Sequence, residues 1–163
     1  MRKKMKRLLG IVLVICMIMG MSVTTYASQN PPNLGETIDG SLLTDENYAE
    51  RIFYNPARGN ILNRGVAKIT DNGNGNINAY GAVFPAVECD TLRLEMTIQR
   101  LEGGSWVNVK SYSNIVYNST LLSKSYNYSA KKGYYYRVKA ACIATKGGTT
   151  ETQMPITDGI WID

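Results

Sequence analysis

The sequence predicts an all-β protein that folds as an antiparallel sandwich of about seven strands. From Gly65 onwards, turn signals recur at intervals of ~8–15 residues, which is typical of all-β domains. Between these turns, apolar and polar residues alternate with the period of two that a half-buried strand requires. A long amphipathic helix pattern is absent from this region.

The clearest strand pair runs from Leu92 to Tyr112. Apolar side chains alternate with polar ones, Gly103-Gly104-Ser105 reverses the chain because glycine readily adopts positive φ, and 106–110 returns as the second strand. We expect the apolar face of this hairpin to join a later strand in one core. The predicted inward residues are Leu92, Leu94, Met96, Ile98, Tyr134, Tyr136 and Val138.

Residues 1–27 have the three parts of a secretory signal peptide. Residues 2–7 carry five basic side chains, residues 8–23 are an apolar run, and Thr25-Tyr26-Ala27 offers small residues for cleavage. An uncleaved anchor is the rival interpretation, but the run is shorter than the ~20 residues that span a bilayer. We expect cleavage after Ala27, contact with the membrane only before cleavage, and release of the protein from the cell. The chain shows no sorting motif or hydrophobic tail before Asp163.

Removing this segment changes the charge of the protein. Five of the 18 basic residues lie in it and none of the 13 acidic ones, which leaves 13 of each sign in residues 28–163. The formal charge of the secreted form is therefore zero, and nothing in its charge predicts a nucleic-acid partner.

Residues 28–59 are predicted to form a leader that precedes the sandwich of residues 60–163. The first part, 28–40, is rich in proline and glycine and has no period, which indicates a flexible segment. Residues 41–56 allow two interpretations. Thr44 can cap a short helix through Ile52, or the segment can lie as an extended arm on which Ile52, Phe53 and Tyr54 dock against the domain.

The remaining strands follow from their turns. Residues 71–76 (DNGNGN) predict a hairpin turn, Pro85 predicts the end of a strand or a bulge, and turns are predicted at 131–133 and 147–148. The strands between these turns are predicted at residues 66–70, 77–83, 121–128, 134–145, 149–154 and 160–162.

The segment GYYYRVKA resembles the sixth strand of fibronectin type III and related immunoglobulin-like domains. That strand carries tyrosine, an apolar residue, valine and alanine at alternate positions, which are Tyr134, Tyr136, Val138 and Ala140 here. The resemblance implies an immunoglobulin-like sandwich in which the hydroxyl of Tyr134 bonds back to the preceding loop. The sequence departs from that family in three ways: its early core tryptophan is missing, Tyr128 replaces a leucine, and residues 28–59 have no counterpart.

A second resemblance covers most of the chain from Leu42 onwards. The segments QRLEGGSWVNVKS, KSYNYSAKKGYYYRVKA and TKGGTTET are similar to small exported proteins of unknown function from Gram-positive bacteria. This resemblance implies an extracellular location and a fold, but no activity.

Cys89 and Cys142 are the two cysteines that follow the signal peptide, and an exported protein can join such a pair. In a fibronectin-like sandwich their strands are antiparallel neighbours, which implies a disulfide. Alternation opposes it, since Cys142 has the inward parity of Val138 and Cys89 the outward parity of Arg93. A bulge near Asp90 would let the sulfurs meet; without one, both remain free thiols.

Catalytic chemistry has little support in this sequence. The chain contains no histidine, so a Ser-His-Asp or Cys-His site and a zinc site of the usual His/Cys kind are excluded. Asp71 begins an oxygen-rich loop, but glycines stand at the alternate positions where calcium ligands belong. We therefore predict no catalytic residue, no metal and no cofactor. A glycan hydrolase with two carboxylates is the alternative, and its acids would come from Glu88, Asp90, Glu95 and Glu102.

Tyrosine and tryptophan side chains dominate the predicted strands. Exposed aromatic rings on a flat sheet can stack on sugars or anchor a protein partner, although they can also simply pack across strands. We therefore predict a non-catalytic binding or interaction module at or outside the cell surface, with a protein or a glycan as partner. A structural or assembly component of the cell surface is the other alternative. The predicted binding surface consists of Trp106, Tyr112, Tyr135 and Arg137.

Overall fold

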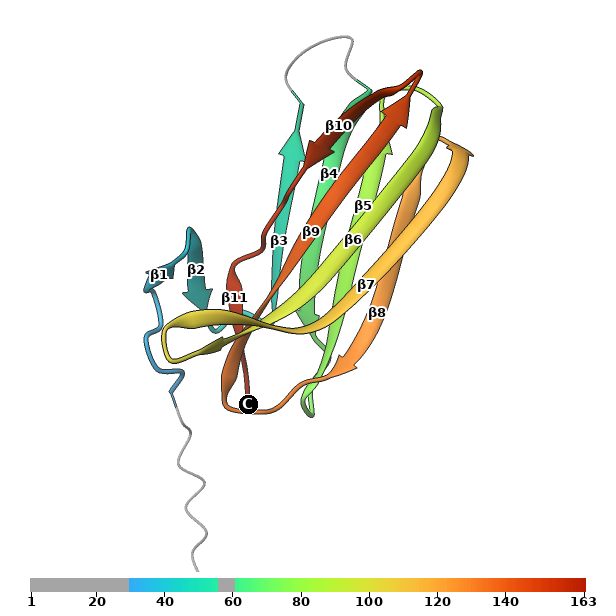
Figure 1. Cartoon of the computed structure of the whole chain (residues 1–163). Helices are drawn as coiled ribbons and strands as arrows, with labels where there is room; N and C mark the ends of the chain where they lie inside the picture. Colours follow the sequence, from blue (N-terminus) through green and yellow to red (C-terminus); the bar gives the residue numbers. More distant parts are fainter. Residues whose placement is uncertain (1–29, 56–60) are drawn as a thin grey trace, which may run out of the picture. The chain divides into compact units, whose positions relative to one another are not determined.

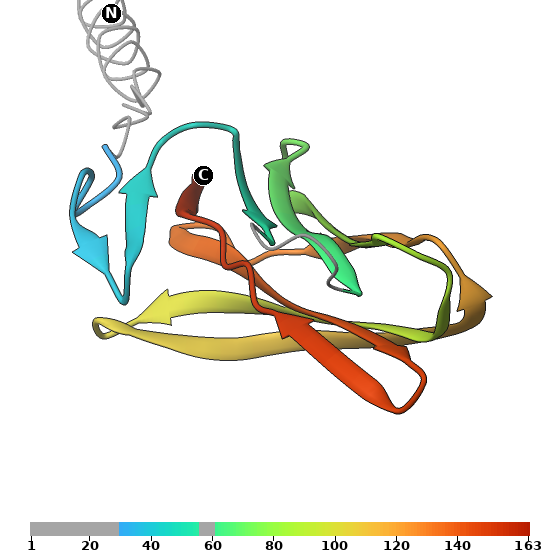
Figure 2. The ribbon, with the colours of Figure 1, turned by 90° about the horizontal axis from the view of Figure 1, so that it is seen from above.

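Two β-sheets packed face to face make up the described part of this chain, residues 30–55 and 61–163 of a computed structural model (Figures 1 and 2). No helix occurs among these residues, so the all-β sandwich prediction is confirmed. No helix there could span a bilayer. The predicted signal peptide lies outside the described residues, and residues 31–163 form one compact unit.

The seven-stranded sheet has the order β1-β2-β11-β9-β6-β7, with β10 also paired to β9, and the four-stranded sheet has the order β3-β4-β5-β8. All pairs are antiparallel except β2 and β11, which run parallel. The strands are β1 (Thr37–Ile38), β2 (Ser41–Thr44), β3 (Tyr48–Tyr54), β4 (Leu62–Asp71), β5 (Asn76–Pro85), β6 (Cys89–Glu102), β7 (Ser105–Ser119), β8 (Leu122–Ser129), β9 (Tyr134–Lys146), β10 (Thr149–Gln153) and β11 (Gly159–Ile162).

The core lies between the sheets, where alternation along β6 and β9 predicted it. Six of the seven predicted inward residues are fully buried, and only Tyr134 is half-buried. The sheets approach closely at Gly81 of β5, where an added Cβ would lie 2.6 Å from the sulfur of Met96. The fully buried predicted residues are Leu92, Leu94, Met96, Ile98, Tyr136 and Val138.

Two of the predicted glycine turns show how the antiparallel strands are connected. Gly103 and Gly104 join β6 to β7 with φ values of 56° and 81°, the left-handed conformations of a two-residue hairpin turn. In the turn between β4 and β5, Asp71 accepts a hydrogen bond of 2.8 Å from the backbone N–H of Gly73. The carboxylate therefore stabilises the turn itself.

The segment predicted as a leader contributes strands to both sheets, so the sandwich has more than the predicted seven strands and begins before residue 60. Residues 41–44 pair with β11 as β2, and residues 48–54 pair with β4 as β3. The extended alternative is therefore right for this segment, and the helical one is wrong. As a strand, 48–54 pairs the backbone groups of alternate residues with β4 and places Ala49 in the core.

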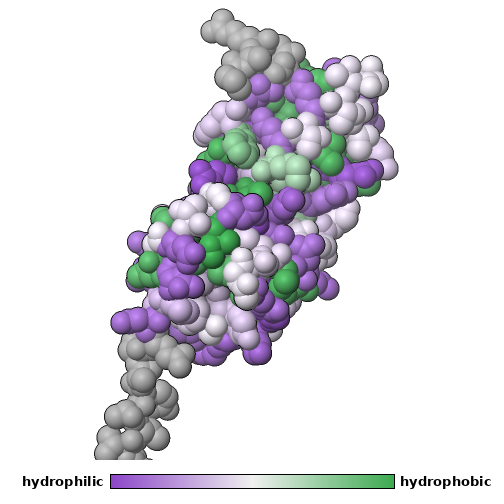
Figure 3. All heavy atoms as spheres, turned by 60° about the vertical axis from the view of Figure 1, so that its left-hand side comes forward, coloured by the Kyte–Doolittle hydropathy of each residue, from purple (hydrophilic) through white to green (hydrophobic). Residues whose placement is uncertain are grey.

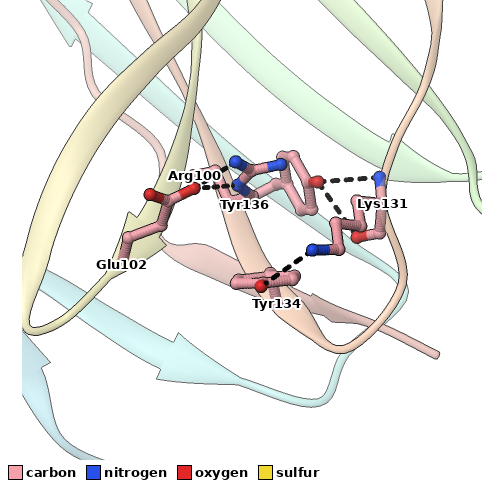
Figure 4. A network of polar contacts seen from close by, with 5 residues as sticks. All are labelled: Arg100, Glu102, Lys131, Tyr134 and Tyr136. Carbon is pink, nitrogen blue, oxygen red and sulfur yellow. Dashed lines mark hydrogen bonds and ion pairs between the residues drawn. The ribbon is translucent and has the colours of Figure 1, made fainter.

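Both tyrosines bond back to the preceding loop (Figure 4): the Tyr134 hydroxyl accepts from the Lys131 side chain at 3.2 Å, as the resemblance implied, and the loop's backbone is bound by Tyr136. The Tyr136 hydroxyl accepts from the Lys131 backbone N–H at 2.8 Å and donates to the Lys131 carbonyl at 3.0 Å. Burial raises the pKa of Tyr136, and a hydrogen bond from Arg100 opposes that rise. Tyr134 lies between two cations, with the ring centroid 4.8 Å from the Arg100 guanidinium and 5.1 Å from the Lys131 ammonium.

The two cysteines are free and buried. Cys142 lies opposite Leu94 in the β6–β9 register, which is five residues along β6 from Cys89. At ~3.4 Å per residue this separates the Cα atoms by roughly 17 Å, whereas a disulfide needs less than about 7 Å. The strands are neighbours, as the resemblance implied, but their register does not bring Cys89 and Cys142 together.

We expect the protein that begins at Ser28 to titrate as two thiols when it is unfolded without reductant. In the folded state both thiols should react slowly, because burial raises the pKa of Cys89 and raises that of Cys142 to about 12. A thiol-reactive chromogenic reagent, added with and without denaturant, measures both quantities. No reactive thiol in the unfolded, unreduced protein would contradict this strand register.

Candidate functional site

The four residues of the predicted binding surface lie on two faces of the sheet. Tyr112 of β7 pairs with Met96 and so points inward, where its ring stacks on that of Tyr126 from β8 with centroids 4.0 Å apart. The Tyr126 hydroxyl donates to the Asn114 side chain at 2.8 Å. These contacts link β7 to β8 and close one lateral side of the sandwich.

Trp106, Tyr135 and Arg137 share the outer face, as alternation predicted for Tyr135, but other parts of the chain contact all three: residues 39–41 contact Arg137, and β11 contacts Trp106 and Tyr135. The Arg137 side chain is only 3% exposed and makes three charge-assisted hydrogen bonds. It donates to Gln99 at 2.8 Å, to Ser41 at 2.9 Å and to Asp39 at 2.8 Å. Two of these acceptors belong to residues 39–41, beside the turn end of β6 and β7 (Figures 1 and 2).

Aromatic rings pack around Arg137 and its hydrogen-bond partners Gln99, Ser41 and Asp39, a group that we call the Arg137 anchor. The Arg137 guanidinium lies 4.3 Å from the ring centroid of Trp106, and the Trp106 ring packs so closely on Gly159 that a Cβ there would lie 2.8 Å from it. Tyr135 meets Trp161 edge to face at 5.1 Å. The guanidinium also holds the pKa of Asp39 below its ordinary value, chiefly through the hydrogen bond. Arg137 therefore binds the protein's own residues 39–41, whereas Trp106 and Tyr135 pack on β11.

The other lateral side of the sandwich is open. Between β3 and the segment that follows β10 lies a cavity of about 380 Å³, lined by Phe53, Tyr54, Asn55, Gln153 and Met154. A second cavity of about 280 Å³ shares Phe53 and Met154 with the first and continues past Arg51 to Ile156 and residues 39–41. Together they form one groove along β3, which we call the lateral groove. Figure 3 brings this side of the molecule forward and shows apolar patches set among polar side chains.

Apolar side chains in the lateral groove are exposed to solvent. Phe53 is 47% exposed, Tyr54 63% and Met154 46%. Tyr54 is positioned by Arg64, whose guanidinium lies 6.0 Å from the Tyr54 ring centroid and 3.9 Å from that of Phe84. The closed side uses Tyr112 and Tyr126 to cover its core, whereas this side leaves comparable side chains in water.

From the sequence, Phe53 and Tyr54 are predicted only as docking residues of an arm, and no site is predicted at them. The groove joins them to Gln153 and Met154, which are about a hundred residues away in the sequence. Only the pairing of β3 with β4 and of β10 with β9 brings the two segments to one side of the sandwich. One signal in the sequence could have indicated this site. Residues Ile52 to Tyr54 form a run of apolar and aromatic side chains, and they lie in a strand at the edge of its sheet.

Three of the four acids considered for hydrolysis have separate partners for their carboxylates. Asp90 accepts from the Gly147 backbone N–H at 2.7 Å, Glu95 lies 3.5 Å from Arg93, and Glu102 is bound to Arg100. Glu88 contributes its backbone carbonyl to Lys146 at 2.5 Å. Among the residues that the structure describes, no group of three or more Cys, Asp or Glu side chains is placed to hold a metal ion.

Comparison with protein families matches residues 40–159 to a family of unknown function, DUF6147. The matched span contains the Arg137 anchor from Gly40 onwards and both sides of the lateral groove. No curated protein and no solved structure matches the chain.

Proposed function

The chain belongs to the DUF6147 family of unknown function, and from its lateral groove we propose that it is a secreted, non-catalytic module that binds glycan at or outside the cell surface. The observation that carries this proposal is the exposure of Phe53, Tyr54 and Met154 beside the amide side chains of Asn55 and Gln153.

The chemistry of these side chains favours a sugar. Aromatic rings present flat apolar faces that stack on the C–H face of a pyranose, and amide groups both donate and accept hydrogen bonds to hydroxyls. The first cavity of the lateral groove, about 380 Å³, is within the volume range of small-ligand sites. The second cavity continues it along β3, which suits a chain of sugars rather than a single one. The groove has one basic side chain, Arg51, and it is paired with Asp158 at 3.5 Å.

The strand order supports a fold of the fibronectin type III kind. Strands β4, β5 and β8 correspond to A, B and E of an immunoglobulin-like sandwich, and β7, β6, β9 and β10 correspond to C′, C, F and G. Strands β1, β2, β3 and β11 are additions to that plan. Since such sandwiches carry many functions, the proposal depends on the groove and not on the fold.

The positions and partners of the acidic side chains support binding without catalysis. Glycoside hydrolysis needs two carboxyl groups on either side of one bond, about 5–9.5 Å apart. The carboxylates of Asp90, Glu95 and Glu102 are held by a backbone amide or a guanidinium, and none of them lines the groove.

The test is binding to purified cell-wall sacculi, followed by a glycan array, with three variants. We expect Phe53→Ala and Tyr54→Ala each to weaken retention on sacculi by about tenfold, since stacking on one ring contributes roughly 1–2 kcal/mol. Tyr117→Ala is the matched control, because Tyr117 is 69% exposed but lies on β7, away from the groove. Equal retention of all four proteins, or no retention of the wild type on sacculi or array, would contradict the proposal.

The proposal that the protein is secreted can be tested separately from glycan binding. Mature protein should begin at Ser28, because the signal peptide is expected to be cleaved after Ala27. Intact-mass measurement of protein from the culture medium gives that terminus directly. Recovery only from membranes, with the basic residues 2–7 still attached, would contradict it.

A further inference from the structure

Strand β3 is a free edge of the four-stranded sheet. Within residues 30–55 and 61–163, its seven residues pair with β4 alone, in a register that is continuous from Tyr48 to Tyr54. The strand contains no proline, no lysine and no bulge, three devices that prevent edge strands from pairing with another chain, and its two charges, Glu50 and Arg51, are of opposite sign. Its other side faces the lateral groove.

The hydrogen bonds that flank the β3–β4 ladder show which backbone groups are unpaired. Asn55 N–H donates to the Asn63 carbonyl at 2.8 Å, and Asp71 N–H donates to the Asn47 carbonyl at 2.7 Å. Since hydrogen-bonded pairs alternate in an antiparallel ladder, odd-numbered residues of β3 bond to β4. The N–H and C=O groups of the even-numbered residues Glu50, Ile52 and Tyr54 therefore point away from the sheet, towards a possible next strand.

We propose that a second copy of this chain occupies this edge, so that β3 pairs antiparallel with β3 and the two four-stranded sheets become one. Such a pair has a twofold axis perpendicular to the sheet, and opposing residues share a face. Pairing centred on Glu50 or Arg51 would oppose two like charges, which is unfavourable. Pairing centred on Ile52 avoids this.

In the register centred on Ile52, the free backbone groups match. Ile52 pairs with Ile52 of the second copy, and Glu50 pairs with Tyr54 of the second copy on both sides of the axis. On the groove face, Arg51 lies opposite Phe53 of the second copy, where a guanidinium and an aromatic ring attract. Residues 28–163 carry 13 charges of each sign, so two secreted copies have no net charge to keep them apart.

Sedimentation velocity over a range of protein concentrations tests the interface. We expect the wild type to shift from monomer to dimer as its concentration rises. Ile52→Pro should remain a monomer, because it removes only an N–H that the fold does not use. Ser123→Pro is the matched control. Ala130 N–H donates to the Gly75 carbonyl, so odd-numbered residues of the edge strand β8 also point outward, and this variant should still form dimers.

A charge exchange tests the register, and it does not depend on a proline being tolerated. Ile52→Lys and Ile52→Asp should each be monomeric, since each places like charges at the axis, and an equimolar mixture of the two should form dimers. A wild type that stays monomeric at every concentration overturns the proposal, as does a mixture that stays monomeric. Because Arg51 of the second copy would cover Phe53, the dimer and a glycan compete for the lateral groove. Loss of the dimer with retention on sacculi intact would leave the glycan proposal standing, so the two can fail separately.

Discussion

Replacing Ile98 by alanine is expected to lower the free energy of unfolding by about 2–5 kcal/mol. The Ile98 side chain is fully buried between the sheets, in the strand that pairs with both β7 and β9. Alanine would remove several buried methylene and methyl groups and leave a cavity that two packed sheets close only in part. Urea denaturation followed by tryptophan fluorescence measures the change.

Ile115→Ala is the control for this experiment, because Ile115 lies on β7 and is 41% exposed. We expect it to change stability by no more than about 0.5 kcal/mol. Equal effects of the two substitutions would mean that the inward and outward faces of the β6–β7 hairpin have been exchanged, which a register shift of one residue would produce.

Arg137→Met is expected to release residues 31–44 from the sandwich while the rest stays folded. The substitution removes all three hydrogen bonds and leaves the Gln99 oxygen, in a residue only 9% exposed, without its guanidinium donor. Loss of one partner of a fully buried ion pair costs ~3–5 kcal/mol. The Asp39 side chain, however, is 70% exposed and returns to water, so the cost should be closer to that of an unsatisfied buried acceptor, about 1–3 kcal/mol.

Limited proteolysis measures this release, since cleavage within residues 31–44 should become much faster in Arg137→Met. Arg93→Met is the matched control: Arg93 pairs with Glu95 on the surface at 46% exposure, and such pairs contribute little to stability.

Acid should also release residues 31–44 from the wild-type sandwich. Because the pKa of Asp39 is lowered in the folded state, its contribution is complete above the unfolded pKa and is lost as pH falls through the folded one. If residues 31–44 stay protected from proteolysis at a pH below both the folded and the unfolded pKa of Asp39, the ion pair with Arg137 does not hold this segment.

Alternation and turn chemistry were sufficient to predict the central part of this fold. The period of two placed Leu92 to Ile98 in the core, and the paired glycines at 103–104 located the hairpin, because both are local effects of backbone geometry. The same rule put Tyr135 and Arg137 on the outer face. It could not show that residues 39–41 cover that face, since this depends on a contact across almost a hundred residues.

Features that depend on strand register or on packing beside the edge strands could not be predicted from the sequence. Tyr134 and Tyr136 have the same parity, so pattern alone could not determine which hydroxyl binds the Lys131 backbone and which binds its side chain. Cys89 and Cys142 were rightly placed on neighbouring strands, but a disulfide depends on their offset along β6 and β9. The lateral groove was missed because it lies between edge strands, where alternation says nothing about which side of a strand remains unpaired.

The parallel pairing of β2 with β11 has a consequence for the order in which the protein folds. β11 lies between β2 and β9, pairing through residues 159–162 close to the end of the chain. During synthesis, β2 leaves the ribosome early and can pair locally with β1. The strand that joins it to the rest of the sheet is β11, which follows much later in the sequence, and contacts so distant in sequence form slowly. The hairpin of β6 and β7 needs only its own two strands and can form first. The N-terminal segment should therefore be the last part of the sandwich to become protected from hydrogen exchange during refolding.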